Sequence, residues 1–381
     1  MIANAVEGET SSSPLPYDCD VAVVGAGPAG SATARWLAQA GCRVVLLERS
    51  NFDEPRVGES LAPGVQPLLR KLGVWPEFLA SAPLPSHGTK SVWGGADVEK
   101  YAHLMSPWGS GWHVDRLAFD RMLAQSARAA GAVLRTGVVP VRCDRLADDW
   151  LLTLQSGDGR AGLELRAHML VDATGRGARL ARWMGARRFL FDRLVSVVGA
   201  LDGIDTAQQG YVMVESISDG WWYTAPVPDG RMMTMLMTDA DLCGRTRLTS
   251  EGEWRRRMRE AQATLARTDA GTPSWGPMVF SSVSQRLLRR ERSAPWLGVG
   301  DAALSVDPIS GSGVVRALRT ARAAADTALA LLVGTAHDAI EAYEVSRDGE
   351  CGAYLNERAQ YYGMEKRWQT SPFWQRRLFD S

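Results

Sequence analysis

The chain has 381 residues, of which 45% are hydrophobic and 23% are charged. This length can bury a substantial core, and it predicts one large domain or two interleaved ones. The 43 basic residues balance the 43 acidic ones, so the net charge is zero. A neutral chain gives no reason to expect nucleic acid or an anionic membrane as a partner.

The cysteines and the N-terminal segment bear on location. The five cysteines are scattered without a CxxC pair, which predicts free thiols in a reducing compartment and no zinc or other metal site. Residues 1–16 are polar and Ser-rich, without the apolar stretch of a signal peptide, and we expect a flexible tail. No run approaches the about 20 apolar residues that span a bilayer. We therefore predict a cytoplasmic protein.

The first predicted elements are a strand, a helix and a second strand. Residues 19–25 form a short Val-rich run that is typical of a buried parallel strand. Residues 28–41 have the apolar spacing of a helix that ends at Gly41, and residues 43–48 form the second strand. Together they predict a βαβ unit with a right-handed crossover.

Further helices and strands follow in the same style. Two helices are predicted at residues 61–72 and 115–130, and Asp115 is a good N-cap for the second. Three strands are predicted at residues 132–136, 150–155 and 168–172.

The pattern changes between residues 194 and 239. Short alternating segments separated by Asp-Gly turns predict an antiparallel sheet there. A helix over residues 251–268, a buried strand over residues 296–300 and a long helix over residues 313–333 follow. The first domain is therefore predicted to be split in sequence by an inserted sheet.

We predict the following division of the chain. The first, nucleotide-binding domain comprises residues 17–88, 108–180 and 276–345; the inserted β-sheet domain comprises residues 89–107 and 181–275; a C-terminal helical segment comprises residues 346–381.

A GxGxxG motif joins the first strand to the first helix as Gly25-Ala26-Gly27-Pro28-Ala29-Gly30. Glycines at these places allow a tight turn, and the helix N-terminus presents free N–H groups to a pyrophosphate. Glu48 at the end of the next strand is suited to accept hydrogen bonds from ribose hydroxyls. The pattern predicts a bound dinucleotide.

A second glycine-rich segment favours FAD over NAD. Gly300-Asp301 closes a buried strand, and Gly311 and Gly313 precede the long helix. This helix start offers N–H groups to the electron-rich edge of a flavin ring, and Asp301 is placed to bind the ribityl chain.

These motifs, with Gly58-Glu59-Ser60, Arg116 and Asp172-Ala173-Thr174-Gly175, resemble one superfamily over roughly residues 18–335. It contains flavin-dependent tryptophan halogenases, geranylgeranyl-type reductases and aromatic hydroxylases. The resemblance implies an α/β fold, a glutathione-reductase-type, FAD-binding Rossmann-like domain with an inserted antiparallel β-sheet for substrate. It also implies that Arg116 and Asp301 contact FAD and that the loop around Gly311 covers the flavin ring.

Sixteen residues are predicted to bind FAD and four to act in catalysis. The cofactor set is Gly25, Gly27, Pro28, Ala29, Gly30, Glu48, Arg49, Ser60, Arg116, Asp172, Gly175, Gly300, Asp301, Gly311, Ser312 and Gly313. The catalytic set is Glu59, Trp221, Tyr223 and Pro308.

The branches of the superfamily differ in two elements. The halogenase W-x-W-x-I-P element corresponds here to residues 221–226, where Tyr223 and Ala225 replace the second Trp and the Ile. The halogenase lysine, about eight residues before a Trp, corresponds to Pro85 if that Trp is Trp93; Lys90 is too close to Trp93. Both departures argue against halogenation. The segment 220–230 resembles instead the flavoproteins that oxidise a protein-borne Trp in the maturation of tryptophylquinone enzymes.

Several residues have a structural and a functional interpretation. Strand alternation places Trp221 and Tyr223 on one face and Trp222 on the other, so one face lines a pocket or both are core. For His87, His103 and His113 we favour a structural role over acid–base chemistry. The aromatic and basic tail, residues 361–379, either docks a partner or, as we favour, caps the sheet as a final helix.

We predict an FAD-dependent monooxygenase that hydroxylates an electron-rich aromatic ring, with an indole favoured, either free or as a Trp of a peptide or protein. The reductant is NAD(P)H or a separate flavin reductase. Three alternatives stay open: a halogenase of an indole or pyrrole, a geranylgeranyl-type reductase, and a non-catalytic FAD-holding maturation partner.

Overall fold

The structure is a computed structural model that describes residues 18–378 except 158, 160, 207–208, 291–293 and 335–337. The predicted flexible tail, residues 1–16, lies outside the described residues, as does the last residue of the predicted C-terminal cap.

The predicted βαβ unit is confirmed as β1 (Asp18–Val24), α1 (Pro28–Gln39) and β2 (Val44–Leu47). β1 pairs in parallel with β2 and with β11 (Ala161–Asp172), at the centre of the first sheet. The strand order is β8-β2-β1-β11-β10-β9, with β19 also paired to β11. The outer strands are β8 (Val133–Arg135), β9 (Val138–Arg145), β10 (Trp150–Ser156) and β19 (Trp296–Gly298).

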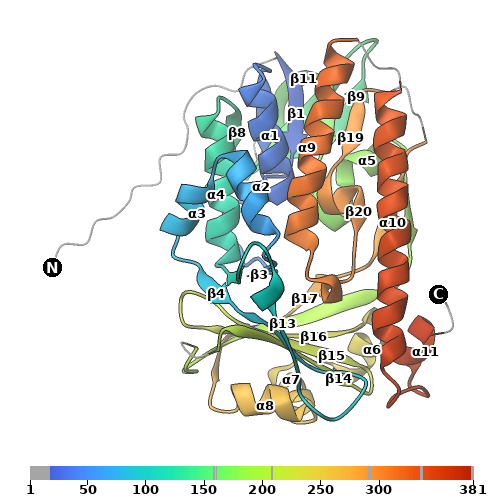
Figure 1. The fold of residues 1–381 in the computed structure, drawn as a ribbon. Helices are drawn as coiled ribbons and strands as arrows, with labels where there is room; N and C mark the ends of the chain where they lie inside the picture. Colours follow the sequence, from blue (N-terminus) through green and yellow to red (C-terminus); the bar gives the residue numbers. More distant parts are fainter. Residues whose placement is uncertain are drawn as a thin grey trace.

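Helices cover one face of this sheet (Figure 1). Val21 and Val23 of β1 share a core with residues of these helices, whereas Ala22 and Val24 join a second core on the other face. This is the alternation that a doubly covered parallel strand requires. The helices are α2 (Val65–Leu72), α3 (Trp75–Ala80), α4 (Arg116–Ala129) and α9 (Gly313–Leu332); η2 (Gly175–Gly177) and α5 (Arg179–Trp183) follow β11. The Asp115 carboxylate caps α4 as predicted, accepting from the N–H of Leu117.

The second sheet lies below the first in Figure 1, in the order β17-β13-β16-β15-β14-β5-β6. The predicted antiparallel pairing of residues 194–239 is confirmed, and β14 pairs in parallel with β5. Its strands are β5 (Gly88–Val92), β6 (Glu99–Ala102), β13 (Leu194–Asp202), β14 (Tyr211–Ile217), β15 (Gly220–Pro226), β16 (Met232–Asp239) and β17 (Thr272–Ser281). The proposed domain boundaries stay a prediction.

Two of the predicted helices are wrong in their extent. The predicted helix 251–268 is two helices, α7 (Glu251–Met258) and α8 (Gln262–Thr268). The break arises because the buried Glu215 carboxylate of β14 accepts from the N–H groups of Ala263 and Thr264 (2.6 Å for Thr264) and so caps α8. The helix predicted from residue 61 begins only at Val65, since Leu61 pairs with Trp112 in a small sheet.

Smaller elements connect these layers. They are β3 (Ser60–Leu61), β4 (Leu84–Ser86), η1 (His103–Met105), β7 (Gly111–His113), β12 (Arg187–Leu190), α6 (Ala240–Thr246), β18 (Gln285–Leu288), η3 (Gly300–Ala302), β20 (Leu304–Ser305) and η4 (Pro308–Ser310).

The C-terminal segment joins the two layers. α10 (Ala339–Met364) runs beside both sheets, and α11 (Pro372–Leu378) lies at the lower one (Figure 1). Tyr362, Phe373 and Trp374 are buried in one core cluster with Trp221. The described part of the tail therefore caps the sheet, as we favoured. Among the described residues, no helix is long and apolar enough to cross a membrane.

Candidate active site

The turn between β1 and α1 leaves no room for side chains at two glycines. A Cβ on Gly25, whose φ is +104°, would lie 2.3 Å from the Ala173 carbonyl oxygen. A Cβ on Gly30 would lie 1.9 Å from the carbonyl oxygen of Gly25. Gly27, the N-cap of α1, faces open space instead. The strand, the helix and the chain after β11 therefore meet tightly and leave the backbone at Gly27 accessible.

Two cavities meet at this turn and share Gly27, Ala173 and Gly175. The first, about 280 Å³, lies between the two sheets. The second, about 410 Å³, extends past Gly25, Glu48 and Arg49. One elongated ligand can therefore occupy both cavities, with its middle at the N-terminus of α1.

Most of the predicted site residues line these cavities. In the first cavity they are Gly27, Pro28, Ala29, Glu59, Ser60, Arg116, Gly175, Tyr223, Asp301, Pro308, Gly311 and Gly313. In the second they are Gly25, Gly27, Glu48, Arg49 and Gly175.

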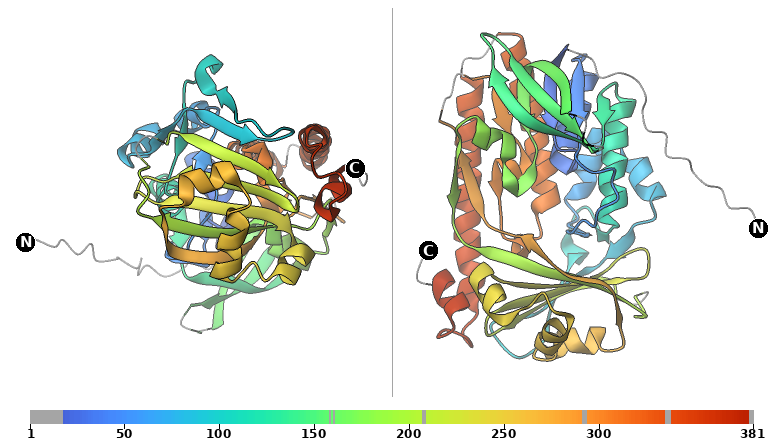
Figure 2. Two further views of the ribbon diagram at one scale, coloured as in Figure 1. Left: turned by 90° about the horizontal axis from the view of Figure 1, so that it is seen from below. Right: turned by 180° about the vertical axis from the view of Figure 1, so that it is seen from behind.

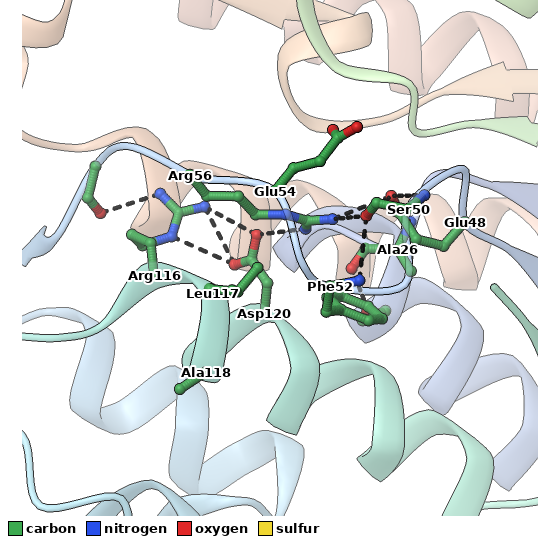
Figure 3. Close-up of polar contacts among 12 residues, drawn as sticks. Ala26, Glu48, Ser50, Phe52, Glu54, Arg56, Arg116, Leu117, Ala118 and Asp120 are labelled. Carbon is green, nitrogen blue, oxygen red and sulfur yellow. Dashed lines mark hydrogen bonds and ion pairs between the residues drawn. The ribbon is translucent and has the colours of Figure 1, made fainter. Parts of the chain in front are cut away.

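Glu48 is held rigidly at the second cavity. Its Oε2 accepts from the N–H of Ala26 at 2.8 Å, and its Oε1 accepts from Ser50 and from Arg56 at 3.0 Å. Figure 3 shows Arg56 lying between Glu48 and Asp120. Oε1 accepts a third hydrogen bond from the Ser50 N–H at 3.2 Å, whereas Ala26 is the one donor to Oε2 among the described residues, so Oε2 keeps a lone pair for a ribose hydroxyl. Arg49, by contrast, is largely exposed and pairs with Glu54 at 3.4 Å.

Arg116 of the first cavity belongs to the same network (Figure 3). Its guanidinium donates to the carbonyl oxygens of Val57 (2.7 Å) and Gly58 (3.0 Å) and pairs with Asp120 at 3.1 Å. Asp120 also pairs with Arg56 at 2.8 Å. A continuous chain of charges thus connects the two cavities. Arg56 and Asp120 were not among the predicted site residues, although the i,i+4 spacing of Arg116 and Asp120 indicates that these two side chains can pair.

Asp172 is placed differently from the prediction. It is fully buried and lines neither cavity. Its carboxylate accepts from the N–H and hydroxyl of Thr174 and from the N–H of Ala181 at 2.7 Å. Asp172 therefore shapes the turn from below, and Ala173, Thr174 and Gly175 are the residues that face the ligand space.

The second glycine-rich segment forms the opposite wall. Asp301 lines the first cavity and pairs with Arg176 at 2.9 Å. Gly300 lies outside the lining; a Cβ there would approach that of Ala29 to 2.6 Å, so this glycine serves close packing. Ser312 also lies outside the lining, and its hydroxyl bonds that of Ser310 at 2.9 Å.

Asp307 fixes the start of the loop over residues 308–313. One carboxylate oxygen accepts from the N–H of Ile309, and the other accepts from the Tyr362 hydroxyl at 2.7 Å. Its own N–H donates to the Tyr354 hydroxyl at 3.0 Å. Burial, reinforced by Asp192, raises the pKa of Asp307. The C-terminal helix α10 thereby holds a cavity loop that sequence motifs alone did not link to it.

Glu59 is a buried carboxyl at the cavity wall. Its Oε2 accepts from the N–H of Gly58 at 3.0 Å, and its Oε1 is buried without a hydrogen-bond partner among the described residues. Burial raises the pKa of Glu59, while neighbours that include Tyr223 and Arg116 oppose that rise. Burial and the charge of Glu59 raise the pKa of Tyr223 as well. Burial is therefore the main cause that favours the protonated state of both side chains.

Trp221 is not a cavity residue. It is 1% exposed, its indole N–H donates to the Tyr362 hydroxyl at 3.0 Å, and it is absent from the lining. Trp222 lies in the core on the other face, against Trp254. The expected alternation is confirmed, but only Tyr223 of the aromatic run faces the cavity. The predicted catalytic role of Trp221 is therefore not supported by its position.

The lysine and histidine candidates also lie outside the cavity lining. The ammonium group of Lys90 lies over the ring of Tyr211, 5.5 Å from its centroid. Burial, together with the charge of Arg267, lowers the pKa of His113 to about 3, so this ring stays neutral. His87 is exposed and His103 half-buried.

These features fit FAD. The backbone at Gly27 can receive a pyrophosphate, Glu48 a ribose, and the space between Arg116, Asp301 and the loop over residues 308–313 the flavin end. At the same wall, the Nε of Arg176 is buried and has no hydrogen-bond partner among the described residues.

Comparisons with known proteins agree with this fit. The FAD binding domain family matches residues 18–351, so the chain belongs to that family. The FAD-dependent oxidoreductase LodB of Marinomonas mediterranea is 30% identical over 365 residues, which cover 94% of this chain and 96% of LodB. Other relatives bear the names of a tryptophan 2-halogenase, a flavin-dependent halogenase and a menaquinone reductase.

Two solved structures are informative. The myxobacterial chondrochloren halogenase CndH has a TM-score of 0.86 at 24% identity, over 95% of this chain and 86% of CndH, which shows the fold. The peptidyl tryptophan dihydroxylase QhpG, essential for tryptophylquinone cofactor biogenesis, has a TM-score of 0.69 at 26% identity, over 94% of this chain and 78% of QhpG. The predicted fold, the FAD cofactor and the class of FAD-dependent oxidoreductase are confirmed.

Proposed function

We propose that this protein is an FAD-dependent monooxygenase that hydroxylates the indole of a tryptophan within a peptide or protein, as a step in making a tryptophylquinone cofactor. We choose hydroxylation over halogenation because of the residues that line the first cavity. Its described lining contains arginines but no lysine. The halogenases that the chain resembles depend on a lysine, and Lys90 lies over Tyr211 instead. Similarity to QhpG supports the substrate class.

When bound and reduced, FAD supplies the electrons that activate oxygen for transfer to an aromatic ring. The protein positions the substrate beside the flavin and keeps bulk water away from both. Val57, Met235 and Met237 make the substrate side of the cavity apolar, and residues 308–311 close it opposite the second sheet. Holding the ring and the flavin together in a space without bulk water converts a bimolecular step into a local one.

Glu59 is the group that can handle a proton here. Its Oε1 has no hydrogen-bond partner in the described part of the chain, so it can accept the N–H of an indole bound at the cavity wall. A carboxyl whose pKa is raised lies closer to neutrality and can take up and release a proton as the ring is oxidised. Tyr223, beside it, is suited to donate to the same carboxylate and to flank the ring.

The test is mass spectrometry on tryptophan, indole and Trp-containing peptides. Each is incubated with the protein, chemically reduced flavin, oxygen and bromide, with catalase in half of the samples. Chemically reduced flavin makes the assay independent of the natural electron donor. We expect products with added oxygen that persist with catalase, on peptides above all.

A halogenase is the second candidate, because relatives named as halogenases are similar over most of the chain. Brominated products would establish it and overturn the monooxygenase. Flavin that is bound and reduced without any product would favour a non-catalytic maturation partner.

A further inference from the structure

A pair of lysines faces each other across two strands of the second sheet. The chain has four lysines, Lys71, Lys90, Lys100 and Lys366. Lys90 of β5 and Lys100 of β6 are direct partners in the antiparallel register. Both ammonium groups lie over the ring of Tyr211 in β14, at 5.5 and 4.6 Å from its centroid. Like charges directly opposite each other destabilise a sheet, so this arrangement calls for a counter-charge.

Two further basic side chains adjoin the same tyrosine. The ring of His87 lies 5.8 Å from that of Tyr211. Arg267 donates to the Tyr211 carbonyl oxygen at 2.9 Å and to the Gln209 amide oxygen at 2.7 Å, both neutral acceptors. We call His87, Lys90, Lys100 and Arg267 the basic cluster.

The basic cluster lacks acidic partners within the part of the chain that the structure describes. No ion pair joins Lys90, Lys100 or Arg267 to a described carboxylate, and the adjacent acid of β6, Glu99, accepts from the Tyr101 hydroxyl. Burial lowers the pKa of Arg267 to about 10, which still leaves it charged at neutral pH. In a chain with zero net charge, this is a local excess of positive charge.

An exposed apolar loop follows directly after β6. Leu104 and Met105 of η1 are 88% and 91% exposed, and Trp108 is 46% exposed. Figure 2 shows this segment projecting from the body of the molecule in the view from below. We call these three residues the apolar loop. Large apolar side chains gathered at such exposure mark a surface that another molecule covers.

Both features are connected to the active site. The apolar loop continues into β7, whose His113 pairs with Ser60, a residue of the first cavity. Tyr211 lies on β14, in which Val214 pairs with Tyr223 at the cavity wall. Tyr211 and Val214 are three residues apart, so their side chains point to opposite faces of β14, and a partner seated on this surface would share that strand with the cavity wall from the other face of the sheet.

We propose that the basic cluster and the apolar loop together dock an acidic segment of the protein that carries the substrate tryptophan. Carboxylates of that segment supply the counter-charge for Lys90, Lys100 and Arg267, and its apolar side chains cover Leu104 and Met105. The proposal rests on the proposed function for the identity of the partner.

The test is a binding measurement with the FAD-loaded full chain and fluorescein-labelled peptides, followed by anisotropy. The peptides share one Trp and two Leu and differ only in three flanking residues, which are Glu, Gln or Lys. We expect the Glu peptide to bind about tenfold more tightly than the Gln peptide, and the difference to shrink with salt.

Variants test whether the basic cluster and the apolar loop cause the preference for the Glu peptide. K90Q/K100Q should remove most of the preference for the Glu peptide, whereas the matched control K71Q/K366Q should keep it. K90E/K100E should reverse the preference toward the Lys peptide, a gain that misfolding cannot produce. L104S/M105S should weaken all three peptides by a similar factor. Retained flavin absorbance confirms that each variant is folded.

The outcomes that would contradict the docking proposal can be told apart from one another. Equal binding of the Glu and Gln peptides, or loss of preference in K71Q/K366Q alone, would overturn the docking surface. Tighter binding to single-stranded DNA or to vesicles containing phosphatidylserine than to the Glu peptide would replace it with another partner. A Glu peptide with Phe in place of Trp should bind equally well. The binding assay therefore tests docking even if the protein hydroxylates none of the peptides. Hydroxylation of the peptides without a preference for the Glu peptide would refute the docking proposal and leave the proposed function intact.

Discussion

Arg56 is the residue on which the link between the two cavities depends. Its guanidinium bridges two carboxylates that are themselves almost inaccessible, Glu48 at 3.0 Å and Asp120 at 2.8 Å. It also donates to the Ser50 hydroxyl at 3.0 Å. The variant Arg56→Met keeps much of the side-chain length and removes the charge and all three donated bonds.

The size of the effect follows from burial. The side chains of Asp120 and Glu48 are 2% and 7% exposed, and that of Arg56 is 18% exposed. Removing one partner of a buried pair costs about 3–5 kcal/mol, because a buried charge is left without its counter-charge. Asp120 keeps Arg116, and Arg56 is partly solvated, so we expect the lower end, about 3 kcal/mol of unfolding free energy.

Urea denaturation of the wild type, Arg56→Met and Arg56→Lys measures this quantity, with Lys expected to lie between the other two because it keeps the charge. Arg43→Met is the matched control, since Arg43 pairs with Asp20 at the surface and its loss should cost far less than that of Arg56. A loss for Arg56→Met that is no larger than the loss for Arg43→Met would refute the reasoning from burial.

Three further predictions concern the site. Gly30→Ala should purify with little or no FAD, because its Cβ overlaps the Gly25 carbonyl oxygen; flavin absorbance of the purified protein checks this, and a stoichiometric flavin content would contradict it. Burial raises the pKa of Glu59, so the folded state binds that proton more tightly than the unfolded state does and loses stability as pH rises from the unfolded pKa through the folded one. Melting experiments should therefore show Glu59→Gln becoming more stable relative to the wild type with rising pH. A pH-independent difference between the two proteins would speak against this. Tyr362→Phe should cost about 1–3 kcal/mol in denaturation, since it leaves Asp307 and the Trp221 N–H short of a buried partner; an effect below about 0.5 kcal/mol would mean that neither bond matters.

The sequence predicted those parts of the fold that local pattern determines. The first βαβ unit, the Asp115 cap and the alternation of Trp221 and Trp222 each follow from the spacing of neighbouring residues. The glycine motifs were informative for the same reason, because the crowding around Gly25 and Gly30 leaves no room for any other residue.

The missed features depend on contacts between distant segments. The break between α7 and α8 is set by Glu215, which lies on a different strand. The network of Arg56 joins residues from separate loops, and Asp307 is held by Tyr362, a residue beyond the segment that the family matches. Asp172 was misjudged because its motif lies next to the ligand space, whereas its side chain points beneath the turn.

The arrangement of the layers explains why one fold can serve several reactions. The first sheet, with its glycine turns, provides the dinucleotide site, and the second sheet presents Tyr223, Met235 and Met237 to the same cavity from the other side. We expect substitutions on the second sheet to change this wall of the cavity and to leave the turns at Gly25 and Gly30 intact. Under the proposed function, the reaction depends on Glu59 and on the side chains that the second sheet presents to the cavity.

The most direct test of the central claim is oxygen-isotope labelling of a Trp-containing peptide. The FAD-loaded protein is reduced without oxygen, mixed with the peptide, and exposed either to labelled oxygen gas in ordinary water or to ordinary oxygen in labelled water. We predict that the heavy isotope enters the Trp residue from the gas and not from the water. Incorporation from water alone, or an unmodified peptide while the flavin reoxidises, would contradict a monooxygenase at this site.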